Sequence, residues 1–180
     1  MQLDSFSSRE FDRGASRSYE AAWLVLSGLL VASWLPGSGW RVLLLRAFGA
    51  QIGTGVVLKP GVRVKFPWRL AVGDHVWIGE DVWIDNLAKV TIGDHTCVSQ
   101  GAYLCTGSHD WNRKSFDLIT SPIVIGNHAW LGAEATLAPG AVMGEGTVLA
   151  MSAFGQGRMS DWTVYAGNPA SPQKPRLRPS

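Results

Sequence analysis

Aliphatic residues recur at six-residue intervals through most of the chain, and the residue after each one is usually small. An α-helix has 3.6 residues per turn and cannot hold a six-residue spacing on one face, and an antiparallel sheet would show a period of two. The spacing predicts a parallel β-helix, in which each side of a triangular coil takes six residues and points its aliphatic side chain inward. The repeating aliphatic positions are Ile52, Leu58, Val64, Val72, Ile78, Ile84, Ile92, Val98, Leu104, Ile125, Leu131, Leu137, Met143 and Leu149.

Three segments of the repeat are near copies of one another. They are "VGDHVWIG" at 72–79, "IGDHTCVS" at 92–99 and "IGNHAWLG" at 125–132. Each copy holds a histidine in the same slot: His75, His95 and His128. A slot that repeats on successive coils predicts a surface turn whose side chains line up along the axis. Zinc needs ligands that converge on one point, so we predict no metal site.

The six-residue rhythm stops between Leu104 and Ile125. We predict that residues 106–122 leave the coil as a loop, and loops on a rigid scaffold often carry binding and catalytic residues. His109 lies in this loop, outside the repeat. An imidazole titrates near neutral pH and can take a proton from an alcohol, so His109 is the candidate general base. A structural hydrogen bond is the alternative role for a loop histidine.

Two apolar segments precede the repeat, "AAWLVLSGLLVASWL" at 21–35 and "WRVLLLRAF" at 40–48. The first is shorter than the roughly 20 residues that a helix needs to span a bilayer. We therefore expect a helical N-terminal unit over residues 1–50, either packed as a cap on the coil or lying on a membrane surface. The β-helix is predicted over residues 51–155, and residues 156–180 are predicted to form a C-terminal tail.

Composition narrows the class of protein. The 180 residues are enough for one domain with a substantial core. A formal net charge of +2 gives no indication of nucleic-acid binding. Cys97 and Cys105 do not make a disulfide framework and favour a reducing compartment. The first residues are polar and unlike a signal peptide, so we expect a cytoplasmic protein, at the inner face of the membrane if the apolar segment binds there.

The six-residue repeats, the ejected loop and the closing "YAGNPA" at 165–170 resemble the hexapeptide-repeat acyltransferases. Within them, "CTGSHDW" at 105–111 and "WIDNL" at 83–87 resemble the colanic acid biosynthesis acetyltransferases of the WcaF type. The resemblance covers about residues 40–170. It implies a left-handed β-helix, a homotrimer with active sites between neighbouring subunits, and acetyl transfer from acetyl-CoA to a sugar hydroxyl. The acceptor that it implies is an exopolysaccharide or its lipid-linked precursor.

The resemblance also implies roles for single residues. His109 matches the catalytic histidine, acting as general base in direct transfer without an acyl-enzyme. The implied acceptor-binding residues are Asp85, Asn86, Asp110 and Trp111. The implied acetyl-CoA-binding residues are Trp130, Ala133, Met151, Pro169, Lys174 and Arg176. Several of these have plainer alternatives: corner residues for Asp85 and Asn86, a turn residue for Asp110, a loop anchor for Trp111, an exposed aromatic of the repeat for Trp130, and a solvated basic tail for Lys174 and Arg176. The chain departs from the family pattern at 155–162, where "GQGRMSDW" replaces the usual "TK" pair.

Two other functions remain open from the sequence. The first is an acetyltransferase for a small soluble acceptor such as a simple sugar, serine or an antibiotic. The second is a β-helix without activity that scaffolds polysaccharide assembly, although a scaffold has no need of His109 and its loop. A zinc-dependent carbonic anhydrase is disfavoured because the repeated histidines do not converge.

Overall fold

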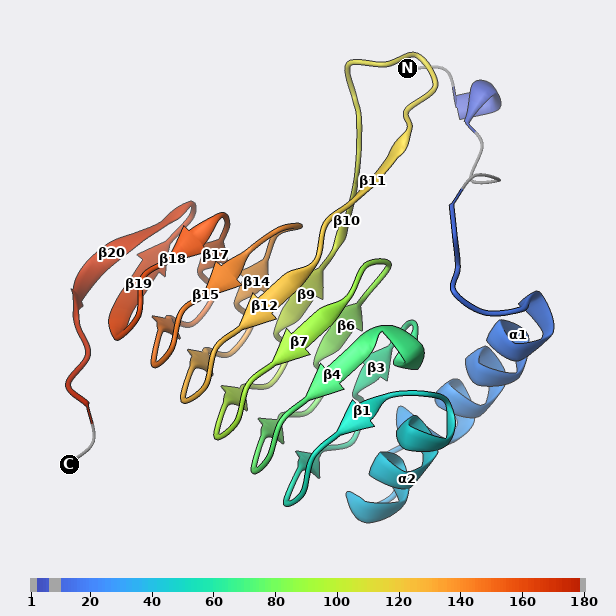
Figure 1. Ribbon diagram of the computed structural model, residues 1–180, viewed down its shortest axis with the longest axis horizontal. Coiled ribbons are helices and arrows are strands. Elements are labelled where there is room, and N and C mark those ends of the chain that lie inside the picture. The colour runs from blue at the N-terminus through green and yellow to red at the C-terminus, as the bar shows by residue number, and fades with distance from the viewer. Residues whose placement is uncertain (1–2, 7–10, 179–180) are drawn as a thin grey trace.

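Three parallel sheets wind around one axis in the computed structural model, which describes residues 3–6 and 11–178 (Figure 1). Sheet A contains β1 (Gln51–Ile52), β4 (Leu70–Val72), β7 (Val90–Ile92), β12 (Ile123–Ile125), β15 (Val142–Met143) and β18 (Arg158–Met159). Sheet B contains β2 (Val57–Leu58), β5 (Trp77–Ile78), β8 (Cys97–Val98), β13 (Trp130–Leu131), β16 (Val148–Leu149), β19 (Thr163–Gly167) and β20 (Ala170–Pro175). Sheet C contains β3 (Arg63–Val64), β6 (Trp83–Asp85), β9 (Tyr103–Cys105), β14 (Thr136–Leu137) and β17 (Phe154–Gly155). The chain passes from A to B to C and back to A, so the predicted β-helix is confirmed.

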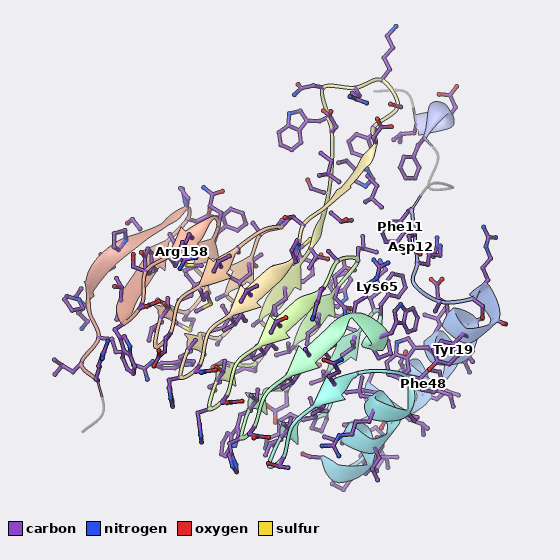
Figure 2. All side chains as sticks on the ribbon, in the orientation of Figure 1. Phe11, Asp12, Tyr19, Phe48, Lys65 and Arg158 are labelled. Carbon is purple, nitrogen blue, oxygen red and sulfur yellow. The ribbon has the colours of Figure 1, made fainter. Side chains whose placement is uncertain are left out.

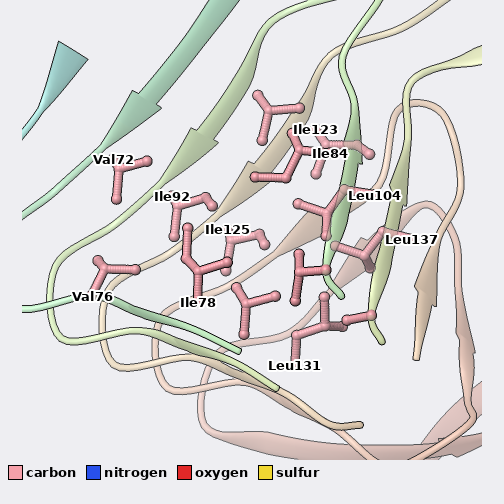
Figure 3. Close-up of a cluster of buried hydrophobic side chains, with 14 of the residues drawn as sticks. Val72, Val76, Ile78, Ile84, Ile92, Leu104, Ile123, Ile125, Leu131 and Leu137 are labelled. Carbon is pink, nitrogen blue, oxygen red and sulfur yellow. The ribbon is translucent and has the colours of Figure 1, made fainter. Parts of the chain in front are cut away.

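The core of the coil is the column of aliphatic side chains that the repeat predicts (Figure 3). Of the fourteen repeating positions all are buried except Ile52, which is half-buried at the start of the first coil. A second inward position lies two residues before each of them, because alternate residues of a strand point to the same face. This position holds smaller side chains such as Val76, Val82 and Ala102. The two positions together fill each side of the coil.

The corners explain why small residues follow the aliphatic ones. A Cβ added at Gly79 would lie only 2.6 Å from the backbone nitrogen of Gln100 on the next coil, so the coils stack too closely there for a side chain. His75, His95 and His128 have positive φ angles of 56°, 54° and 58°. They are turn residues, as predicted, and their rings stack with centroids 5.1 and 5.3 Å apart.

Two helices cover the N-terminal end of the coil (Figure 1). These are α1 (Arg17–Leu26), which continues as the π-helix η2 (Ser27–Val31), and α2 (Gly39–Ala47). Trp23 anchors the first one, since its ring is buried and its Nε1 donates to the Val64 carbonyl oxygen at 2.9 Å. Tyr19 and Phe48, labelled in Figure 2, join α1 to the end of α2 with ring centroids 5.0 Å apart.

The outer face of this helical unit is apolar. Leu24, Leu29 and Trp34 are 72%, 69% and 81% exposed. Within residues 3–6 and 11–178, no helix is long and apolar enough to cross a membrane. Two short 3₁₀ helices, η1 (Leu3–Ser5) and η3 (Pro67–Arg69), complete the helical elements of the described chain.

The parallel ladder continues past residue 155, where we expected the coil to give way to a tail. Val142 pairs with Arg158, and Val148 pairs with Val164. The six-residue aliphatic repeat ends here for two reasons. Gly155, and not an aliphatic residue, takes the inward position beside Leu137. The next inward residue, Met159, follows after only four positions. Only then does β20 turn back antiparallel to β19.

Candidate active site

The segment that interrupts the rhythm is a β-hairpin that rises from the corner between sheets C and A (Figure 1). Its strands are β10 (Gly107–His109) and β11 (Leu118–Thr120), which pair antiparallel with Gly107 opposite Thr120 and His109 opposite Leu118. At its base the Ser121 amide donates to the Thr106 carbonyl oxygen at 2.9 Å. The hairpin therefore leaves the coil as an ordered element and returns to the same corner.

His109 is held in one orientation by Phe116. The His109 Nδ1 lies 2.7 Å from the Phe116 carbonyl oxygen, and the two rings stack with centroids 4.2 Å apart and an interplanar angle of 2°. A carbonyl oxygen can only accept a hydrogen bond, so in the neutral imidazole Nδ1 carries the proton and Nε2 has the lone pair. Phe6 meets the imidazole edge-on at 5.4 Å. The arrangement presents a proton acceptor at Nε2.

Phe116 and Phe6 were not identified from the sequence. Phe116 has a positive φ of 51°, a left-handed conformation that is uncommon for an aromatic residue and that tends to mark functional sites. This turn directs the Phe116 carbonyl toward the imidazole. The only sequence signal for Phe116 is an aromatic residue within the ejected loop. No repeat fixes the position of Phe6, which lies far from His109 along the chain.

Asp110 and Trp111 lie at the far end of the hairpin. The Asp110 carboxylate accepts from the Asn112 amide at 3.0 Å, and its other oxygen lies 3.4 Å from the Arg113 Nε. These contacts orient the turn of the hairpin. Trp111 is exposed, which leaves its ring open to contact an acceptor or a neighbouring chain.

Asp85 lies at the base of the hairpin. Its backbone oxygen accepts from the Thr106 amide and, at 2.9 Å, from the Thr106 hydroxyl. Its carboxylate lies 3.1 Å from the Lys65 Nζ and accepts a hydrogen bond from the Tyr103 hydroxyl at 3.1 Å. Burial raises the pKa of Tyr103, with smaller contributions from the Cys105 thiol and Asp85, so the phenol stays protonated and remains a donor.

Asn86 has a structural contact in place of the acceptor contact that we predicted. Its side chain is fully buried. The amide oxygen accepts from the Phe66 backbone N–H at 2.9 Å, and the amide nitrogen donates to the Phe66 carbonyl oxygen at 2.6 Å. Both ends of the amide thus join two successive coils, and burial keeps the remaining N–H and lone pair away from a sugar.

The candidate cofactor residues surround sheet B. Trp130 projects from its outer face and donates from Nε1 to the Ser99 hydroxyl at 2.9 Å. Ala133 and Met151 lie on successive coils at the corner between sheets B and C, where the Ser152 amide donates to the Ala133 carbonyl oxygen at 2.9 Å. The turn that contains Pro169 joins β19 to β20 at the same end of sheet B.

The two basic candidates lie elsewhere. Lys174 is exposed on β20, opposite Val164. The Arg176 guanidinium donates to the His128 carbonyl oxygen at 2.7 Å and to the Gly146 carbonyl oxygen at 3.0 Å, and it lies 5.7 Å from the Trp162 ring centroid. These contacts place Arg176 at the corner between sheets A and B, on the opposite edge of sheet B from Ala133.

The three groups of candidate residues therefore lie at three different corners of the β-helix. His109 stands at the corner from C to A, and Ala133 and Met151 stand at the corner from B to C, so the width of sheet C separates them. Within one chain the hairpin carries His109 and Asp110, and Asp85 contacts Thr106 at its base, but the cofactor candidates lie at other corners. In the described part of the chain, no three of the His, Cys, Asp and Glu side chains are grouped so that they could hold a metal ion.

Comparison with known proteins identifies relatives of the whole chain. It is 39% identical over 170 residues to "Putative colanic acid biosynthesis acetyltransferase WcaF" of Escherichia coli K12, covering 93% of each chain. It is 30% identical to the same organism's "Putative lipopolysaccharide biosynthesis O-acetyl transferase WbbJ", covering 68% of each. No family model matches the chain.

Solved structures of hexapeptide-repeat acetyltransferases have the same fold. The hexapeptide-repeat acetyltransferase VCA0836 of Vibrio cholerae, determined with acetyl coenzyme A, superposes with a TM-score of 0.83 at 25% sequence identity and covers 97% of each chain. The match spans both the helical cap and the coil. With WcaF related over 93% of its length, this chain belongs to the WcaF family of hexapeptide-repeat acetyltransferases and is an acyltransferase.

Proposed function

We propose that this chain transfers an acetyl group from acetyl-CoA to a sugar hydroxyl during exopolysaccharide synthesis, with His109 as the general base. The observation that carries the proposal is the His109–Phe116 contact of 2.7 Å, which leaves the lone pair on Nε2. The relatives WcaF and WbbJ, named for polysaccharide biosynthesis, support the acceptor class.

The imidazole would act twice. As the acceptor oxygen attacks the thioester carbonyl carbon, Nε2 takes the hydroxyl proton, and the carbon–sulfur bond breaks. The imidazolium then gives that proton to the departing sulfur, so CoA leaves as the free thiol and His109 regains its starting form. The Phe116 carbonyl accepts from Nδ1 throughout and stabilises the positive charge on the ring.

The donor would lie along the corner between sheets B and C. The small side chain of Ala133 would let a pantetheine arm approach closely, and the exposed Met151 and Trp130 offer apolar contact. Lys174, exposed on β20, would supply positive charge for the phosphates of CoA, whereas Arg176 would meet only a part of CoA that extends across sheet B to the corner between sheets A and B. VCA0836, which covers 97% of this chain, was determined with acetyl coenzyme A, and this supports the assignment.

A homotrimer would complete the site. The catalytic and cofactor candidates stand on opposite edges of sheet C, so a neighbouring copy can bring its B–C corner to the C–A corner of the first. A rotationally symmetric assembly repeats this contact between every pair of neighbours. The exposed apolar face of α1 and η2 would rest on the cytoplasmic membrane surface, where a lipid-linked acceptor is presented.

The test is acetyl-CoA cleavage, followed as free CoA thiol with nucleotide sugars and lipid-linked glycans as acceptors. We expect His109→Asn to lower kcat by about a hundredfold or more. His95→Asn is the matched control, because His95 is an exposed histidine of the repeat outside the hairpin, and it should retain full activity. Equal rates for wild type and His109→Asn would refute the general-base mechanism. Failure of the wild-type protein to bind acetyl-CoA would favour a scaffold.

A further inference from the structure

A groove of about 290 Å³ lies between the N-terminal helix and sheet C. One wall comes from α1 and η2 and includes Leu24, Gly28 and Ala32. The other wall comes from the first two coils and includes Arg63, Lys65 and Trp83. The groove is separate from the corner that holds the cofactor candidates, and neither His109 nor its hairpin lines it.

The helix wall is apolar and open. A Cβ atom added at Gly28 would meet nothing within 4 Å outside its own helix backbone, so the described chain leaves space at this point of the groove. Leu24 lines the groove and is also 72% exposed, which makes the wall continuous with the apolar outer face of the helix. The helix turns as a π-helix from Ser27, an irregularity that recurs at functional sites. This wall suits a hydrocarbon chain that enters from the outer face.

The sheet wall is cationic. The Arg63 guanidinium carbon lies 4.6 Å from the Trp83 ring centroid, and Arg63 forms no ion pair with residues 3–6 or 11–178. Lys65 pairs with Asp85 at 3.1 Å, so one of the two cations is neutralised and the wall keeps the positive charge of Arg63. Lys65 has further N–H donors to offer and Arg63 presents a planar fork, which is the chemistry that binds phosphate oxygens.

The position of the cations links this groove to the candidate active site. Asp85, the partner of Lys65, accepts two hydrogen bonds from Thr106, the residue at which the His109 hairpin leaves the coil. A phosphate held by Lys65 and Arg63 would therefore be linked through Asp85 to the base of that hairpin. A sugar attached to the phosphate would extend toward the hairpin, while a chain attached on the other side would follow the helix wall.

We propose that this groove binds the isoprenoid phosphate of a lipid-linked glycan, and so selects the membrane-borne form of the acceptor. The proposal rests on the proposed function, which supplies the sugar acceptor. An apolar wall beside paired cations fits a ligand with both a hydrocarbon chain and a phosphate. A free nucleotide sugar has no group for the Leu24–Ala32 wall.

Direct binding tests the groove without relying on acetyl transfer. Isothermal titration with farnesyl phosphate, farnesol and inorganic phosphate separates the two halves of the ligand. We expect farnesyl phosphate to bind wild type at least about tenfold more tightly than either fragment. Gly28→Leu, which fills the groove, should weaken binding about tenfold or more, and Arg63→Gln should weaken it by a similar factor.

Two control variants isolate the groove from the rest of the cap. Gly39→Leu is the matched control, since Gly39 in α2 also has open space around its Cβ position but lies outside the groove, and it should bind as wild type does. Leu29→Glu places a charge on the exposed outer face of the helix. It should reduce sedimentation with vesicles of anionic phospholipid while leaving farnesyl phosphate binding unchanged. Melting temperatures confirm that each variant is folded.

Equal binding of farnesyl phosphate by wild type and Gly28→Leu would overturn the proposal. It would also be overturned if wild type bound no farnesyl phosphate and Gly28→Leu changed the oligomer size, because a second copy of the chain would then occupy the groove. Transfer to a soluble sugar, measured on the same preparations, keeps the two proposals distinct. Turnover without lipid-phosphate binding refutes only the groove, and binding without turnover on any acceptor refutes only the catalytic proposal.

Discussion

At the scale of single residues, the hairpin depends on Phe116 for more than its carbonyl oxygen. The Phe116 ring covers one face of the imidazole at 4.2 Å, so it fixes the plane in which Nε2 points. Phe116→Asn keeps the carbonyl and tolerates the left-handed backbone but removes the ring. We expect kcat to fall about tenfold, because small errors in the placement of a base are costly, while the KM for acetyl-CoA stays within about twofold.

Phe116→Tyr is the conservative variant, and it should restore kcat to the wild-type range since a phenol ring stacks in the same way. Steady-state kinetics with acetyl-CoA and the best acceptor measure both constants. A rise in the KM for acetyl-CoA with kcat unchanged would show that Phe116 acts on donor binding, which contradicts the positioning role.

At this scale, the sequence indicated candidate residues where a residue broke a pattern. His109 was identified because it stands outside the repeat, and the structure gives it a defined orientation. The sequence assigned Asn86 to acceptor binding, but hydrogen bonds to the Phe66 backbone on the preceding coil set the direction of the Asn86 side chain. The repeat does not show which way a corner side chain points. The contacts of Phe6 and Phe116 with His109 likewise could not be predicted, because they are tertiary contacts outside the six-residue repeat.

At the scale of elements, the attachment of α1 to the coil depends on Trp23. This ring is 2% exposed and donates to the Val64 carbonyl oxygen at 2.9 Å. Trp23→Phe should lower the free energy of unfolding by about 1–3 kcal/mol, because it removes the donor and leaves a small cavity. Trp34→Phe, at an exposed position of the same helical unit, should change it by no more than about 0.5 kcal/mol.

Thermal and urea unfolding measure both variants, and limited proteolysis shows whether residues 17–35 become accessible first. Equal stability of Trp23→Phe and Trp34→Phe would mean that other contacts hold the helix on the coil. The groove would then open and close independently of Trp23.

The strands and corners could be predicted wherever the six-residue repeat of aliphatic residues continued. Each six-residue unit from Ile52 to Leu149 contains a strand, an inward side chain and a tight corner, because the β-helix is the packing that accommodates all three. The last coil was not foreseen because Gly155 replaces an aliphatic residue and Met159 follows after four positions, although parallel pairing continues to Tyr165. The strand pairing within the hairpin also lay outside the repeat, because it depends on contacts between β10 and β11 alone.

At the scale of the whole molecule, the width of sheet C separates His109 from Ala133, and this separation is the reason for proposing that each active site is shared between two chains. His109→Asn and Ala133→Trp should each abolish acetyl transfer, the first by removing the base and the second by blocking the donor. If every site combines the hairpin of one chain with the B–C corner of its neighbour, mixed oligomers of the two variants contain some complete sites.

Random mixing in equal amounts would make about a quarter of the interfaces complete. We therefore expect the co-expressed and co-purified variants to recover up to about a quarter of wild-type kcat, with the oligomer mass determined by light scattering. Separately purified variants that are combined without exchange of subunits serve as the control and should stay inactive. If each chain carried a whole site, no mixture would regain activity, because every chain would have a defect in its own site.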